Sequence, residues 1–104
     1  KRADDVTIHV PAPGPGPWKK GSVQNVSWWC NECKSSDKVI VEIIEIYDEF
    51  ELGDTVFSEV RDNPVVGSLF FKIDNNWNTT RYRAFVFLYS DQLQYGVSKE
   101  FSID

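Results

Sequence analysis

Short runs of alternating apolar and polar residues, separated by turn-forming residues, recur along the whole chain. Such alternation places every second side chain of an extended strand against a core. We predict strands, in chain order, at 6–10, 23–29, 39–47, 55–60, 68–73, 81–89 and 97–103. This pattern, without a segment that favours a helix, predicts an all-β fold, an immunoglobulin- or fibronectin-III-like sandwich of about seven antiparallel strands.

Proline, glycine and acidic residues mark the turns between these strands. The Pro- and Gly-rich run at 11–17 lacks amide donors that strand pairing requires, so we expect the chain to turn there. The segment Val39–Tyr47 also fits one face of a helix, but its β-branched residues favour a strand. An acidic turn is expected at Asp48–Asp54, with Gly53 in the left-handed conformation, and a further turn at Asp62–Pro64.

The strand predicted at 81–89 has two different faces. The face expected in the core carries Tyr82, Ala84, Val86 and Leu88, and the outer face carries Arg83, Phe85, Phe87 and Tyr89. Tyr82 lies where immunoglobulin-like domains often have a tyrosine whose hydroxyl bonds to upstream backbone, although an ordinary half-buried tyrosine fits as well. Exposed aromatic residues Phe85, Phe87 and Tyr89 would favour a protein partner or a homodimer, unless a loop or long neighbouring side chains cover them.

Length and composition restrict the possible functions. The chain has 104 residues, which suits a single domain at 1–104. With 41% hydrophobic and 14% aromatic residues it is too apolar for a disordered segment. A net charge of −5 repels phosphate backbones, so we expect no nucleic-acid partner. No apolar run approaches the roughly 20 residues that cross a bilayer, and we expect no membrane insertion by this segment.

Two motifs carry a family resemblance. Trp18–Trp28 has the form W-x-x-G-x-x-x-x-V-x-W after a first strand and a Pro/Gly turn, and Ser98–Ile103 has the form S-x-x-F-x-I. Both resemble the fungal Ser/Thr-rich GPI-anchored cell-wall family, which is similar to yeast cell-wall synthesis proteins of β-1,6-glucan assembly. The resemblance spans about Val6 to Ile103. It implies an extracellular immunoglobulin-like module at the fungal wall, with no catalytic residues to carry over.

The chain also departs from that family. It has no Ser/Thr-rich tail and no C-terminal signal for a GPI anchor, so we expect either a trimmed or a freely secreted member. The Cys30–Cys33 segment and the acidic turn lie outside the family motif. The triplets that begin at Asn25 and Asn78 fit N-glycosylation, and together with the resemblance they predict a secreted glycoprotein.

The pair Cys30-x-x-Cys33 is expected to form a local disulfide after the second strand, as in a secreted chain. A redox site of thioredoxin type needs a helix N-terminus in an α/β fold. A zinc site needs two further ligands, and His9 is the only histidine. We therefore expect no metal at these cysteines.

The tryptophans supply the candidate glycan contacts. Trp28 is expected in the core and Trp18 over the end of the sandwich, whereas Trp29 must point to the opposite face from Trp28. Trp77 lies in a polar loop with Asn75 and Asn76, and exposed indoles suit the apolar faces of sugar rings while amides bond to their hydroxyls. The sequence thus offers Trp77, Trp29, Asn75 and Asn76 as a glycan site, with folding of Trp77 over the core edge as the alternative.

Enzymatic and cofactor functions find little support. The chain has one histidine, no nucleophile motif and no Gly-rich phosphate loop. Glu42 and Glu45 could form a glycosidase pair, but a sandwich of this size has little volume for the cleft. The acidic residues of Asp48–Asp54 lack the alternating pattern of a calcium loop. We predict a non-catalytic module without cofactor or metal that contacts wall glycan, with a protein-interaction or self-assembly domain as the alternative.

Overall fold

Two antiparallel sheets, packed face to face, form the structure. The computed structural model describes residues 6–48 and 51–104, in which eight strands occur. The strands are β1 (Thr7–Ala12), β2 (Val23–Asn31), β3 (Lys38–Asp48), β4 (Glu51–Asp62), β5 (Val66–Lys72), β6 (Arg81–Leu88), β7 (Asp91–Val97) and β8 (Phe101–Ser102). One sheet has the order β1-β2-β5 and the other the order β4-β3-β6-β7, with β8 paired to β6.

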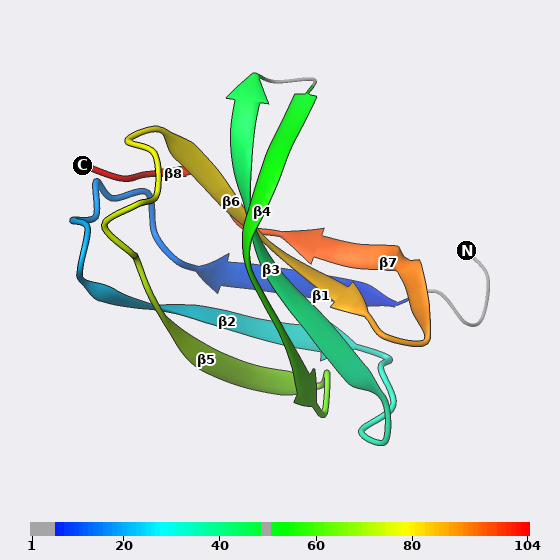
Figure 1. Cartoon of the computed structure of the whole chain (residues 1–104). Helices are drawn as coiled ribbons and strands as arrows, with labels where there is room; N and C mark the ends of the chain where they lie inside the picture. Colours follow the sequence, from blue (N-terminus) through cyan, green and yellow to red (C-terminus); the bar gives the residue numbers. More distant parts are fainter. Residues whose placement is uncertain (1–5, 49–50) are drawn as a thin grey trace.

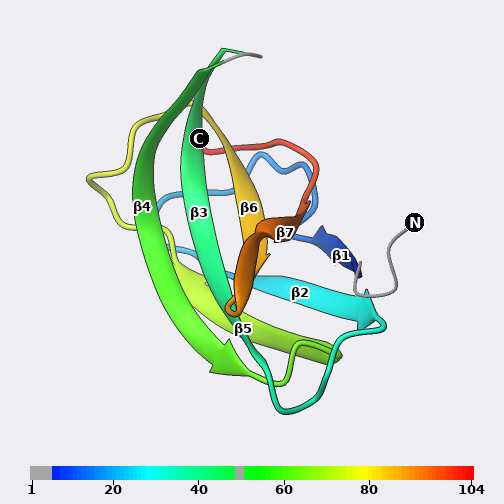
Figure 2. The ribbon, with the colours of Figure 1, turned by 90° about the vertical axis from the view of Figure 1, so that its right-hand side faces the viewer.

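The strand order confirms the predicted sandwich. The chain changes sheets between β2 and β3, between β4 and β5, and between β5 and β6, and every pairing of named strands is antiparallel. Figure 1 shows the two layers crossing, and Figure 2 shows β3 and β4 curving together, with the end of β3 and the start of β4 lying beyond the other strands. A three-stranded sheet facing a sheet centred on the third and sixth strands is typical of immunoglobulin-like domains.

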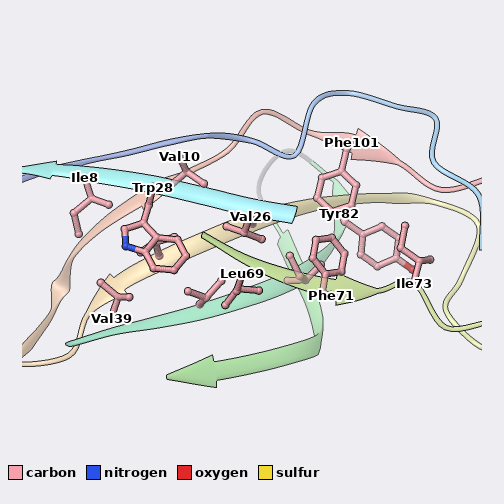
Figure 3. Close-up of a cluster of buried hydrophobic side chains, with 14 of the residues drawn as sticks. Ile8, Val10, Val26, Trp28, Val39, Leu69, Phe71, Ile73, Tyr82 and Phe101 are labelled. Atoms are coloured by element: carbon pink, nitrogen blue, oxygen red, sulfur yellow. The ribbon is translucent and has the colours of Figure 1, made fainter. Parts of the chain in front are cut away.

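The core between the sheets consists of the inward side chains that the alternation predicted. Val26 and Trp28 of β2 face Val39 and Val41 of β3, and all four are at most 2% exposed. Figure 3 shows Trp28 and Val26 beside Leu69, with Phe71, Tyr82 and Phe101 gathered at the other end of the core. On β6, the predicted inner residues Tyr82, Ala84, Val86 and Leu88 are all buried.

Trp18 covers the end of the sandwich, as predicted. Its indole Nε1 donates a 2.8 Å hydrogen bond to the carbonyl of Gly14, and its ring packs against the core. Its backbone forms a parallel bridge with Ile103. The Pro/Gly segment is therefore tied to the C-terminal strand as well as to its own turn.

The C-terminal strands differ from the prediction. In place of one strand at 97–103 the chain forms β7, a break at 98–100 and then β8. Val97 is therefore 37% exposed on the outer face, whereas Phe101 and Ile103 are buried. The strand β7 lacks a clear alternation because it lies at the sheet edge, where Leu93 is exposed and Gly96 packs against the backbone of Ile8.

The acidic turn is also shorter than predicted. β3 continues to Asp48 and β4 begins at Glu51, so Gly53 lies inside a strand and its φ is not positive. Gly53 instead lies against the ring of Tyr47, which leaves no room for a side chain. The turn residues Glu49 and Phe50 lie outside the described residues. No helix long and apolar enough to cross a membrane occurs among residues 6–48 and 51–104.

Candidate functional site

The loop before β6 does not present Trp77 to solvent, so this part of the predicted glycan site is wrong. Trp77 is 7% exposed and stacks on Phe71 with ring centroids 6.0 Å apart and planes 12° apart. Its other neighbour is Tyr82, with centroids 5.5 Å apart. An indole gains more from this apolar contact with β5 and β6 than from exposure in a polar loop. Asn75 and Asn76 are exposed but have no exposed indole from Trp77 beside them.

Tyr82 holds this loop in the way typical of immunoglobulin-like domains. Its hydroxyl donates a 2.6 Å hydrogen bond to the backbone carbonyl of Asn78. The Asn78 side-chain Nδ2 in turn donates a 3.0 Å hydrogen bond to Oε2 of the buried Glu45. Burial, followed by the negative charge of Glu45, raises the pKa of Tyr82 to about 12. The loop is thereby fastened to β3 and β6 and has a structural role.

Trp29 points away from the core, as predicted, and is the exposed tryptophan of the described residues, at 42%. The β1–β2 register places it opposite His9, and the two rings stack with centroids 3.8 Å apart and planes 13° apart. His9 therefore covers one face of the indole and fixes its orientation. A ligand has access to the remaining surface of a side chain that is already ordered.

A groove with a volume of about 540 Å³ lies beside this stacked pair. It runs between the Pro-rich end of β1 and the segment that follows β7, and its walls include His9, Pro11, Pro15, Trp29, Val97 and Lys99. Polar and apolar surface contribute to these walls in similar amounts. Proline and aromatic rings offer apolar contact, and the side chains of Lys99, His9 and Trp29 carry nitrogen atoms that can form hydrogen bonds. A concave surface that combines rings with hydrogen-bonding groups suits a ligand that has both apolar and polar faces.

A second candidate surface covers the outer face of the larger sheet. Cross-strand neighbours Val60, Ile40, Phe87 and Tyr95 form a row across β4, β3, β6 and β7. The rings of Phe85, Phe87 and Tyr95 lie 5.5–6.1 Å apart. Phe85 is only 7% exposed because the other two rings cover it, whereas Tyr95 is 52% exposed.

The predicted interface residues thus lie on the expected face, but only some of them are accessible. Phe87 is half-buried, and Tyr89 is exposed just beyond the end of β6, with the Lys38 ammonium 6.0 Å from its ring centroid. Tyr95 takes the place that Phe85 was expected to have on the accessible surface. The sequence did not reveal this residue because its strand was not recognised.

The predicted disulfide is present between Cys30 and Cys33, where β2 passes into the segment before β3. Figure 1 shows this connection at the opposite end of the sandwich from the loop before β6. Cys30 is buried in the core and Cys33 lines a second groove with a volume of about 470 Å³. The walls of this groove carry Glu32, Lys34, Asp37 and Asp91. Their mixed charges give no single ligand chemistry.

Neither a metal-binding cluster nor a similarity to known proteins helps to choose between these candidate sites. Within the described ranges no three His, Cys, Asp or Glu side chains are grouped so that they could hold a metal ion. The chain matches no protein-family model, no curated protein and no solved structure. The resemblance drawn from the two sequence motifs therefore stays a prediction.

Proposed function

We propose that this chain is a non-catalytic, secreted module of the fungal cell wall that contacts a wall glycan, with β-glucan as the leading candidate, in the groove beside Trp29. The observation that carries the proposal is the exposed indole of Trp29, stacked on His9 at the edge of a groove with both apolar and polar walls. Sugar rings have an apolar face of C–H groups that packs on such surfaces. A side chain that is already ordered loses little conformational entropy when the ligand binds.

The polar groups of the groove suit the same ligand. Sugar hydroxyls can accept hydrogen bonds from an ammonium or an indole N–H, and Lys99 and Trp29, which line the groove, carry these donors. The volume of about 540 Å³ lies within the range of small-ligand sites. The two sequence motifs, which resemble a fungal wall family, add β-glucan as the first polymer to test.

A pull-down on insoluble β-glucan, chitin and cellulose tests this function. We expect depletion of the wild type by one polysaccharide, loss of depletion in Trp29→Ala and weaker depletion in Lys99→Ala. Tyr95→Ala, which lies on the other sheet, is the matched control and should bind as the wild type does. Near-UV circular dichroism verifies that each variant is folded. No depletion of the wild type by any of the three polymers overturns the proposal.

A second candidate function is self-assembly or protein binding through the outer face of the larger sheet. The row of Val60, Ile40, Phe87 and Tyr95 favours it, because large contiguous apolar patches on a protein surface often mark interaction sites. Light scattering over a range of concentrations should give a dimer mass that Tyr95→Arg abolishes and Trp29→Ala leaves unchanged. A monomer mass at every concentration for the wild type rejects the homodimer.

A further inference from the structure

The outer face of the smaller sheet combines a glycosylation triplet with an exposed aromatic ring. Val26 and Trp28 point into the core, so Asn25 and Ser27 of the same strand point outward. The register of β2 and β5 pairs Asn25 directly with Phe70. Directly opposite residues on one face have Cβ atoms about 4.5–5.5 Å apart. Asn25 and Phe70 are therefore immediate neighbours.

Phe70 is unusually accessible for its residue type. It is 72% exposed, and the neighbouring cross-strand pairs on this face are Ser27 with Ser68 and Val23 with Lys72. Short hydroxyl side chains on one side cannot cover a phenyl ring. The ring therefore offers an open apolar surface beside the amide of Asn25.

We propose that Asn25 carries an N-linked glycan whose first N-acetylglucosamine packs its apolar face on the ring of Phe70. The donor is an oligosaccharide linked to a lipid diphosphate. The transfer forms a bond between the anomeric carbon and Asn25 Nδ2, breaks the bond between that carbon and the diphosphate oxygen, and releases the lipid diphosphate and one amide proton. Phe70 takes no part in the transfer, and it binds the sugar once both are present.

The modification precedes folding of this sheet. Val26, the central residue of the triplet, is fully buried, and β2 is paired on both sides by β1 and β5. An enzyme that must hold the triplet in its own site cannot reach it in the folded sheet. The glycan is therefore attached to the unfolded chain, and its contact with Phe70 forms when β2 and β5 pair.

The second triplet, at Asn78, offers a different environment. Its side-chain Nδ2 donates a hydrogen bond to Glu45, so a sugar on this atom competes for space at a buried carboxylate. The adjacent Trp77 is stacked on Phe71 and offers no open ring. A stabilising contact between sugar and ring is thus expected at Asn25 and not at Asn78.

Secretion of the full chain from a eukaryotic host tests the proposal by intact mass and peptide mapping. Thr80→Ala removes the second triplet and keeps the Asn78 side chain, so this variant serves as the background. We expect a glycan at Asn25 that Ser27→Ala abolishes. Trimming with an endoglycosidase that leaves only the first sugar should preserve the melting temperature, whereas the Ser27→Ala chain should melt about 4 °C or more lower.

Phe70→Ala tests whether the ring of Phe70 is the surface on which the sugar packs. Val66→Ala, on the same face of β5, is the matched control. Phe70→Ala should remove the difference in melting temperature between glycosylated and unglycosylated chains, and Val66→Ala should retain it. A secreted chain with unmodified Asn25, or an equal stabilisation in Phe70→Ala, overturns the proposal. This inference rests on the proposed function only in assuming that the chain is secreted. The two can fail separately, because the polysaccharide pull-down tests the groove beside Trp29, whereas intact mass and melting temperature test the modification of Asn25.

Discussion

The hydroxyl of Tyr82 offers a direct test of how the loop before β6 is held. The ring is 0% exposed, and the hydroxyl donates its 2.6 Å hydrogen bond to the carbonyl of Asn78. Tyr82→Phe retains the ring, which packs against Trp77 and Phe101, and deletes only the donor. The variant therefore separates this hydrogen bond from the apolar packing around it.

The expected loss follows from the burial of Tyr82 and the partial burial of its hydrogen bond to Asn78. A hydrogen bond of this kind contributes about 1 kcal/mol to the free energy of unfolding, and a part-buried carbonyl left without a donor costs up to about 1 kcal/mol more. We expect Tyr82→Phe to lose about 1.5 kcal/mol, which lowers the melting temperature of a domain of this size by roughly 6–12 °C. Urea unfolding followed by tryptophan fluorescence measures the loss, and an unchanged m-value shows that the denatured state is comparable.

Tyr95→Phe is the matched control because its half-exposed ring lies on the outer face. Its loss should stay below about 0.5 kcal/mol, as for most surface substitutions. If Tyr82→Phe is as stable as this control, the hydrogen bond to Asn78 does not hold the loop. The interpretation that the hydrogen bond from Tyr82 to the loop before β6 stabilises the fold is then refuted.

The remaining predictions concern the same core and its ends. The pKa of Tyr82 is about 12 in the folded chain against 10 in the unfolded chain, so the folded state holds this proton more tightly. The contribution of this proton to the free energy of unfolding should therefore be fully present below pH 10 and be lost between pH 10 and 12. Urea unfolding across this range should show a smaller decrease in the free energy of unfolding for Tyr82→Phe than for the wild type. Gly67→Ala should lose about 1–3 kcal/mol in urea unfolding, because its Cβ would meet a buried indole, while Gly14→Ala, whose Cβ would have 3.9 Å to its nearest neighbour, should lose far less. Reduction of the disulfide between Cys30 and Cys33 should lower the free energy of unfolding by no more than about 2 kcal/mol, since this disulfide closes a very short loop. A larger loss, measured by thermal unfolding with reductant, would mean that the disulfide also maintains tertiary packing.

The sequence by itself determined the fold class and most inward side chains. Alternation along a strand has a period of two, so Val26 and Trp28 had to share one face and Trp29 the other, whatever the partner strands were. The same argument placed Tyr82 in the core, and its position after the Asn-rich loop indicated the backbone hydrogen bond that the structure confirms. These properties are local, and the chain carries them without tertiary contacts.

Loop residues and edge strands were decided by the tertiary structure. The sequence around Trp77 is polar. This indole is buried only because the folded chain places Phe71 of β5 and Tyr82 of β6 against it. Strand β7 escaped prediction because an edge strand buries few side chains and so need not alternate.

The candidate binding surfaces depend on register, which the alternation leaves open. His9 meets Trp29 and Asn25 meets Phe70 only because particular residues of β1 and β5 lie opposite particular residues of β2. A different register would preserve the inward and outward pattern if it shifted by two residues, yet it would separate both pairs. Strand periodicity fixes which face a side chain occupies, whereas its neighbour on that face is chosen by the packing of the whole sandwich.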